Sequence, residues 1–330
     1  MTSPWILVAL ACVAGEGELH RFQAERPAMG TKFTIVLYAP AAEAAERAFE
    51  AAFARIVELN AVFSDYDESS EACRLSRTSG SGQAVAVSGD MWTVLQRSQQ
   101  IAEATGGAFD VTVGPLTKLW RRARRQHQLP DAERLQQARA AVGWQHVRLD
   151  AAQRTVALAV PGMRLDFGGI AKGYAVDEAL QKLRALGLCR ALVNASGNMA
   201  IGDPPPDKNG WKIGIAPLDP QQLPTRFLHL ANCGVATSGD GWQFVEIAGR
   251  RYSHILDPHT GMGLTQRSSV TLLAPDGMTA DGLAKVCVLG PQRGLELIER
   301  TPGTACLMVC LEGTQVKTYE SKRFAEWDRK

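Results

Sequence analysis

A short stretch that ends in Lys172 carries the residues best suited to bind a phosphate. Asp166 closes an apolar run, the pair Gly168-Gly169 follows, and Lys172 falls in the first turn of a predicted helix. Adjacent glycines allow a sharp turn and a close approach of the backbone to a ligand. The free N–H groups and the positive end of the helix dipole then attract phosphate, and a lysine adds a full charge. Asp166 can hold a metal ion or a hydrogen-bond donor beside them.

The same stretch is also compatible with an ordinary connection between a strand and a helix, with a solvated lysine. It matches neither GxGxxG nor GxxxxGK(S/T), the two standard nucleotide-binding fingerprints. Its interpretation as a phosphate site therefore depends on residues elsewhere in the chain.

His254, at the end of a predicted strand, is the residue best suited to transfer a proton. The ordinary pKa of histidine lies near neutrality, so the neutral ring can accept a proton from a hydroxyl nucleophile. Asp257 follows closely and can orient the ring. Alternatively, Asp257-Pro258 only makes a turn and His254 has a structural role.

Two further acidic residues, Asp110 and Asp281, lie beside apolar segments. Asp281 can offer carboxylate oxygen to a hard cation such as Mg²⁺. It can equally act as the N-cap of a helix that runs to Val288. Asp110 lies within an apolar stretch, where an unpaired carboxylate would be costly, so it must be paired or bound to something.

Length, composition and charge restrict the classes of function. The 330 residues are 45% hydrophobic and 21% charged, as in soluble globular proteins. The formal net charge of +2 argues against nucleic acid as a partner. We interpret the basic run Arg121–Arg125 as a solvated helix face. None of the seven cysteines forms CxxC or another zinc-binding spacing.

The N-terminus has features of an export signal. An apolar run over residues 5–14 is short for a membrane span, and small residues precede Cys12, a candidate for lipidation. No basic residue precedes the run, which departs from a typical signal. We assign residues 1–20 to an export signal or lipoprotein leader and residues 21–330 to one functional domain.

The elements that must position these residues follow from hydrophobic periodicity. Helices are predicted over residues 41–63, 91–105, 131–142, 172–186 and 282–288. Strands are predicted over residues 32–38, 147–149, 155–160, 191–194, 211–216, 243–247, 251–254, 269–273 and 305–310. Strands and helices alternate irregularly, without a repeat or a linker. We therefore predict one compact α/β or α+β domain with mixed sheets.

Eight short motifs occur in an order that resembles one enzyme family. They are Arg26–Thr31 (RPAMGT), Phe63–Tyr66 (FSDY), Cys73–Ser76 (CRLS), Gly107–Pro115 (GAFDVTVGP), Asp166–Asp177, Gly234–Asp240 (GVATSGD), Ser253–Gly261 and Thr279–Gly290. The chain resembles the FAD:protein FMN transferases, the ApbE-like flavin transferases once described as thiamine-biosynthesis lipoproteins. The resemblance covers nearly all of the chain after the leader.

The resemblance implies a central cleft that binds FAD and an enzyme that breaks its pyrophosphate with Mg²⁺. FMN is then attached through a phosphoester to a threonine or serine of a target flavoprotein, and AMP leaves. It also implies a bacterial protein that faces the periplasm, in agreement with the leader. Two rivals stay open: hydrolysis of FAD to FMN and AMP, and a periplasmic protein that binds FAD without catalysis.

The resemblance also implies roles for individual residues. His254 takes the proton from the acceptor hydroxyl, with Asp257 beside it. Asp281 and the backbone carbonyl of Gly169 are Mg²⁺ ligands. The residues that it implies to contact FAD are Met29, Tyr66, Ala108, Phe109, Asp110, Asp166, Lys172 and Ile255. Taken by themselves, Met29 can equally be a core residue and Tyr66 an exposed aromatic residue of a turn.

Two residues depart from the family pattern. Lys285 stands where the family often has a threonine that ligates the metal, and a protonated lysine has three donors and no acceptor. Asn198 stands where the family usually has an acid. Both changes reduce the negative charge available to Mg²⁺ and favour the rival without catalysis. We predict that Lys285 has a catalytic role and pairs with a pyrophosphate oxygen; the alternative is a side chain that turns outward.

Overall fold

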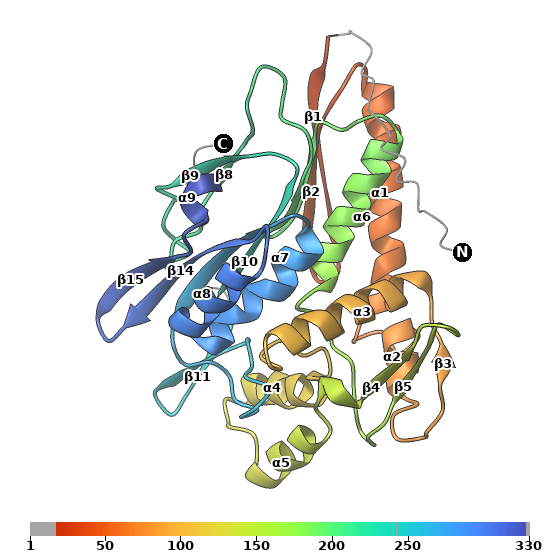
Figure 1. The fold of residues 1–330 in the computed structure, drawn as a ribbon, viewed down its shortest axis with the longest axis vertical. Coiled ribbons are helices and arrows are strands. Elements are labelled where there is room, and N and C mark those ends of the chain that lie inside the picture. The colour runs from red at the N-terminus through yellow and green to blue at the C-terminus, as the bar shows by residue number, and fades with distance from the viewer. Residues whose placement is uncertain (1–17, 240, 242, 328–330) are drawn as a thin grey trace.

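An antiparallel sheet of eight strands lies at the centre of the computed structural model, which describes residues 18–239, 241 and 243–327 (Figure 1). Its strands follow the order β1 (His20–Ala28), β2 (Thr31–Ala39), β6 (Ala191–Ala195), β7 (Asn198–Ile201), β10 (Cys233–Gly239), β13 (Ser268–Ala274), β14 (Ala305–Glu312) and β15 (Gln315–Glu320). Every pair of neighbours is antiparallel. The α+β class is thereby confirmed, and the parallel pairing of a mixed sheet does not occur within this sheet.

Helices α1 (Ala42–Phe63) and α6 (Ala171–Ala185) lie side by side against one face of the sheet (Figure 1). Apolar residues at helical spacing, from Ala45 to Phe63, form the buried face of α1. This face packs with Phe33 and Ile35 of β2 in the main core. Helix α7 (Gly277–Leu283) packs on both α6 and β10.

The opposite face of the sheet is covered by the hairpin of β8 (Trp211–Gly214) and β9 (Phe227–Leu230), together with α9 (Phe324–Trp327). Trp211 and Phe324 pack there against Leu273 of β13. Because both faces of the sheet are covered, every residue of β13 is buried. This explains why its sequence, SSVTLLA, does not alternate between polar and apolar residues.

The remaining elements flank this core. A three-stranded sheet contains β3 (Val85–Ala86), β5 (Thr155–Leu158) and β4 (Val147–Asp150). A separate hairpin contains β11 (Phe244–Ile247) and β12 (Arg250–Ser253). The other helices are α2 (Glu71–Ser76), α3 (Gly89–Ala104), α4 (Gly114–Gln126), α5 (Ala132–Ala140) and α8 (Pro291–Arg300), with the 3₁₀ helices η1 (Trp144–His146) and η2 (Ala284–Leu289).

The hairpin that leads to His254 is held against α4. The ring of Trp120 in α4 lies 5.3 Å from the ring of Tyr252 in β12, between centroids. The Trp120 indole N–H also donates a hydrogen bond of 2.8 Å to the carbonyl of Gly261. These contacts place the loop after β12, which begins with His254, beside α4.

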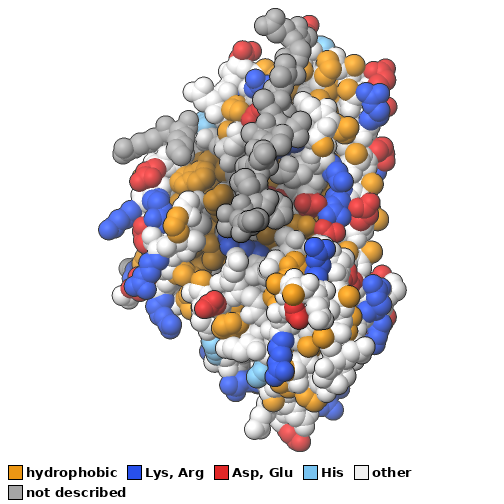
Figure 2. Space-filling view, turned by 45° about the vertical axis from the view of Figure 1, so that its right-hand side comes forward, with side chains coloured by type: hydrophobic (Ala, Val, Ile, Leu, Met, Phe, Trp, Pro, Cys, Tyr) orange, Lys and Arg blue, Asp and Glu red, His pale blue; other side chains and the backbone are white. Residues whose placement is uncertain are grey.

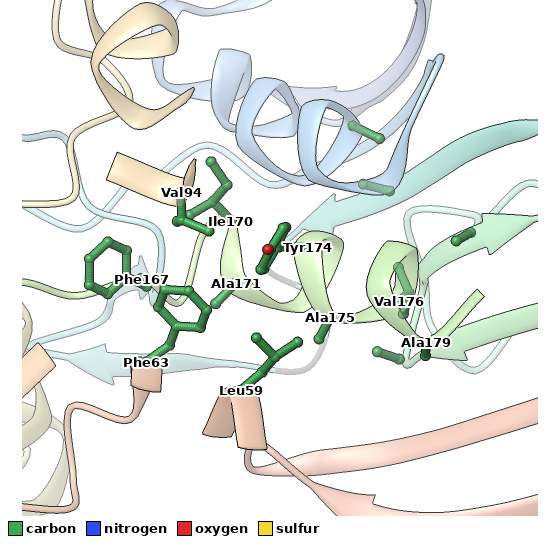
Figure 3. Packing of buried hydrophobic residues seen from close by; sticks show 14 of the residues in the cluster. Leu59, Phe63, Val94, Phe167, Ile170, Ala171, Tyr174, Ala175, Val176 and Ala179 are labelled. Atoms are coloured by element: carbon green, nitrogen blue, oxygen red, sulfur yellow. The ribbon is translucent and has the colours of Figure 1, made fainter. Parts of the chain in front are cut away.

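The turn that precedes α6 is anchored in the main core (Figure 3). Phe167 is buried, and its ring lies edge-on to Phe63 of α1 with 5.2 Å between centroids. Tyr174, one turn into α6, meets the same Phe63 ring at 6.0 Å. Aromatic contacts therefore hold the chain on both sides of Gly168-Gly169 and fix the start of α6.

The predicted helices over residues 41–63, 91–105 and 131–142 and the predicted strands are confirmed, although their ends shift. Strand β1 escaped prediction because most of its residues are exposed and do not alternate. Strands β7 and β10 are rich in small residues that carry little periodicity. The helix predicted from residue 282 starts earlier, at Gly277, and changes to the 3₁₀ helix η2 after Leu283.

The leader predicted over residues 1–20, with Cys12, lies outside the described residues up to position 17. Within the described part of the chain, no helix combines the length and apolar character that crossing a membrane requires. On the face shown in Figure 2, basic and acidic side chains are interspersed among apolar ones.

Candidate active site

Asp281 lies inside α7 and points at the first turns of α6. Its side chain is 2% exposed, and Oδ2 accepts a hydrogen bond of 3.0 Å from the backbone N–H of Gly173. The N-cap of α7 is instead Asp276, which accepts from the N–H of Thr279. The alternative in which Asp281 is an N-cap is therefore wrong. Asp281 joins α7 to the positive end of α6.

Lys285 points inward. Its Nζ donates to Ser238 Oγ at 3.0 Å and lies 3.2 Å from the carbonyl oxygen and 3.3 Å from Oδ1 of Asp281. A Cβ added to Gly169 would lie 3.3 Å from Lys285 Cε and 3.4 Å from the ring of Phe109. The structure thus brings Phe109, Gly169, Asp281 and Lys285 together, and the outward alternative for Lys285 is wrong.

His254 is held by the loop before β11. Its Nδ1 lies 3.1 Å from the carbonyl oxygen of Gln243, and its backbone N–H donates to the same oxygen at 3.0 Å. A carbonyl can only accept, so Nδ1 carries the hydrogen and Nε2 keeps a free lone pair. The orientation of this ring therefore comes from the backbone of Gln243.

The surroundings of His254 keep its ring neutral at pH 7. Desolvation by the surrounding protein comes first among the causes that lower the pKa of His254, and the Gln243 carbonyl opposes it. Three cations lower the pKa further: Lys285 of η2, Arg124 of α4 and Lys172 of α6. His254 keeps access to solvent, and its pKa lies below the usual value of histidine.

Asp257 does not orient this ring through a described contact. Its Oδ1 accepts from the N–H of His259 at 2.9 Å, and its Oδ2 accepts from Thr260 Oγ1 at 2.9 Å. Both oxygens belong to a local turn, as the alternative interpretation of Asp257-Pro258 predicted. The orienting role that the sequence suggested for Asp257 is instead taken by the Gln243 carbonyl, which holds the His254 ring.

The backbone at the start of α6 is less open than the sequence suggested. The N–H of Gly168 donates to Asp166 Oδ1 at 2.8 Å, and those of Ile170 and Ala171 donate to the carbonyl of Phe167. Lys172 Nζ donates to the carbonyl of Gly168 at 2.9 Å and is half-buried. An anion at this turn would therefore contact the Lys172 side chain rather than a set of free backbone N–H groups.

Arg121 was assigned to a solvated helix face, and this assignment is wrong. Its guanidinium bonds to the Asp65 carboxylate, lies 3.5 Å from Asp166 Oδ2 and stacks 4.1 Å from the ring centroid of Tyr66. The Tyr66 side chain remains 75% exposed. Arg121 and Arg124 share one face of α4, since residues three apart are neighbours on a helix. That spacing is the signal in the sequence that marks this face.

The other predicted contacts with FAD are Asp110, Ala108, Ile255 and Met29. Asp110 is buried, and it accepts from the N–H and Oγ1 of Thr112 and from the N–H of Trp144, so it is paired within the protein. Burial raises its pKa despite these bonds. Ala108 and Ile255 are buried. Met29 lies in the turn between β1 and β2, with φ of 48°, and packs against the main core.

Comparison with known proteins identifies the family of this chain. The model of the ApbE family matches residues 29–308. The chain belongs to the ApbE family. The FAD:protein FMN transferase of Treponema pallidum is 33% identical over 92% of this chain and 88% of its own. That of Vibrio cholerae is 32% identical over 96% of both chains.

Solved structures of ApbE proteins share the fold. The flavin transferase ApbE from Vibrio cholerae superposes with a TM-score of 0.85 at 30% identity, covering 94% of this chain and 100% of its own. The apo form of the flavinyl transferase ApbE from Pseudomonas stutzeri gives a TM-score of 0.82 at 31% identity, covering 96% and 99%. The compact α+β domain of this ApbE family member is therefore that of known flavin transferases.

Magnesium, which the resemblance implied, does not fit the side chains of this ApbE family member. Asp281 Oδ1 faces the Lys285 ammonium, and Ser238 Oγ accepts from the same group. An ion at the ~2.1 Å that Mg²⁺ takes from oxygen would lie against that ammonium and repel it. No group of three or more Asp, Glu, His or Cys side chains within the described ranges is placed to hold a metal. We assign no step to a metal ion.

Proposed function

We propose that the chain is an FAD:protein FMN transferase that moves FMN to a threonine or serine hydroxyl of a target protein. The observation that carries this proposal is the geometry of His254: its Nδ1 faces the Gln243 carbonyl, and its Nε2 is left as a proton acceptor in the field of three cations from three elements. The cations attract a pyrophosphate. The neutral ring accepts a proton. Membership of the ApbE family supports FAD as the substrate.

The transfer forms one bond and breaks another. The acceptor oxygen bonds to the phosphorus on the riboflavin side of FAD, and the bond from that phosphorus to the bridging oxygen breaks. The bridging oxygen leaves with AMP. The hydroxyl proton passes to Nε2 of His254, the nitrogen that the Gln243 carbonyl leaves free. Because the side chain is exposed, the proton can then pass to solvent.

Incubation with FAD and a flavoprotein domain that carries an acceptor threonine tests this proposal. We expect flavin fluorescence on the acceptor band of a denaturing gel and one AMP released for each flavin attached. Free FMN with AMP, and no labelled acceptor, would identify a hydrolase instead. Unchanged FAD in complex with the protein would identify a protein that binds FAD without catalysis.

Replacing Lys172 by alanine is expected to weaken binding of FAD and ADP by roughly 10- to 100-fold, the range for a lost charge-assisted hydrogen bond. Riboflavin lacks the pyrophosphate, so its affinity should not change. Lys182→Ala, at an exposed position of the same helix, is the control. Titration calorimetry measures all three ligands, and an equal loss for each would show that Lys172 acts through folding.

Replacing Arg121 by alanine is expected to weaken FAD binding about tenfold, since the ring of Tyr66 loses its stacked cation and Asp166 loses its ion pair. The largely buried Asp65 carboxylate also loses its partner, so thermal unfolding of the variant is measured beside its affinity. Quenching of flavin fluorescence measures the affinity. Arg122→Ala, exposed on the same helix, should bind as the wild type does; identical affinities for the two variants would contradict the assigned role.

A further inference from the structure

The surroundings of the Lys285 ammonium have the composition of a small cation site. They consist of the Ser238 hydroxyl at 3.0 Å, the Asp281 carbonyl at 3.2 Å and Asp281 Oδ1 at 3.3 Å. Hydroxyl, carbonyl and carboxylate oxygens are the atoms with which proteins bind hard cations. Here the cation that they surround belongs to the chain itself.

The charges at this position balance without a further ion. A carboxylate as buried as that of Asp281 requires a partner of opposite charge, and Lys285 supplies one. Asn198 of β7 pairs in register with Ala236, which precedes Ser238 by two residues on the same face of β10. Neither Asn198 nor Ser238 carries a charge. A divalent ion would therefore add two charges where one carboxylate is already neutralised.

The Lys285 side chain is also placed to reach a ligand. Its stem runs against the backbone of Gly169, in the turn before α6. The two Asp281 acceptors belong to one residue and lie at similar distances, so a single N–H can serve both. Another N–H serves Ser238. The third N–H is left for an oxygen of a bound anion, and 18% of the side chain remains exposed to admit one.

We propose that the Lys285 ammonium is the cation of the transfer reaction and makes transfer independent of a divalent metal. It contacts the pyrophosphate and compensates the charge that grows on the bridging oxygen as that oxygen separates from the FMN phosphorus and leaves with AMP. The acceptor oxygen takes the place of the bridging oxygen on the FMN phosphorus, and the hydroxyl proton goes to His254. This inference rests on the proposed function.

Transfer assays in excess chelator test the inference. The wild type is expected to keep its rate within about twofold when EDTA replaces Mg²⁺. Lys285→Thr exchanges the ammonium for an oxygen that can ligate a metal; it should be slowed by roughly 10²-fold in EDTA and recover with Mg²⁺. Lys285→Met lacks both charge and ligand and should stay slow in either condition. Lys182→Thr, at an exposed position on α6, is the matched control.

Binding gives a readout that does not depend on transfer. The wild type is expected to bind ADP with the same affinity in EDTA and in Mg²⁺, and to show no tight Mn²⁺ site by electron paramagnetic resonance. For Lys285→Thr, the affinity for ADP should depend on the metal, and the signal of bound Mn²⁺ should appear. The inference would be overturned if the wild type lost its transfer activity in EDTA and recovered it at the same Mg²⁺ concentration as Lys285→Thr. If no condition supports transfer, the proposed function fails, and ADP and Mn²⁺ binding still decide the role of Lys285.

Discussion

His254→Ala is expected to slow flavin transfer by roughly 10²- to 10⁴-fold, the usual contribution of a general base, while FAD still binds. The reason is that Nε2 of this ring is the free acceptor that the hydrogen bond from Nδ1 to Gln243 leaves available. Single-turnover formation of the flavin–acceptor adduct measures the effect. His229→Ala, exposed on β9, is the control.

The pH dependence of transfer provides an independent check of the same base. His254 accepts a proton only when it is neutral, so activity is present above its pKa in the folded protein and is lost as the pH falls through that value. Desolvation, with the nearby cations, lowers this pKa to about 4. The acid limb of the rate profile should therefore lie well below the ~6.5 of an ordinary histidine. A limb at or above that value, or unchanged transfer by His254→Ala, would falsify this assignment.

Gly173→Ala is expected to destabilise the protein by roughly 1–3 kcal/mol or more, and to abolish most transfer activity. An added Cβ would lie 2.2 Å from the carbonyl oxygen of Gly277 and 2.7 Å from Asp281 Cβ. These are backbone and stem atoms, so the clash is relieved only if α6 and α7 move apart. Separation would also lengthen the bond from Gly173 N–H to Asp281 and shift Lys285 with it.

Urea denaturation measures this loss against a matched substitution. Gly89 lies, like Gly173, in the first turn of a helix, here α3, but a Cβ there would meet no atom within 4 Å. Gly89→Ala should therefore leave stability unchanged or raise it slightly, since alanine favours helices. Equal stability of the two alanine variants would show that the crossing of α6 and α7 is not as tight as the structure indicates.

The sequence by itself determined the class of elements and the family. The apolar spacing of residues 41–63 predicts α1 because it matches the helical period, and that period depends only on local geometry. The hairpin of β11 and β12 follows from two alternating runs around a short turn. The order of the short motifs indicates the ApbE family. These signals are local or additive along the chain, so no contact between distant residues is needed to detect them.

The tertiary structure alone decided which of these residues lie together. Asp281 resembles an N-cap in the sequence, yet the crossing with α6 turns it toward Gly173. Arg121 resembles a solvated residue until α4 packs beside Asp65 and Asp166. Lys285 points inward because the backbone at Gly169 leaves room for its stem and Ser238 of β10 accepts its hydrogen bond. These partners lie far apart in the chain, and only the packing of helices on the antiparallel sheet brings them within bonding distance.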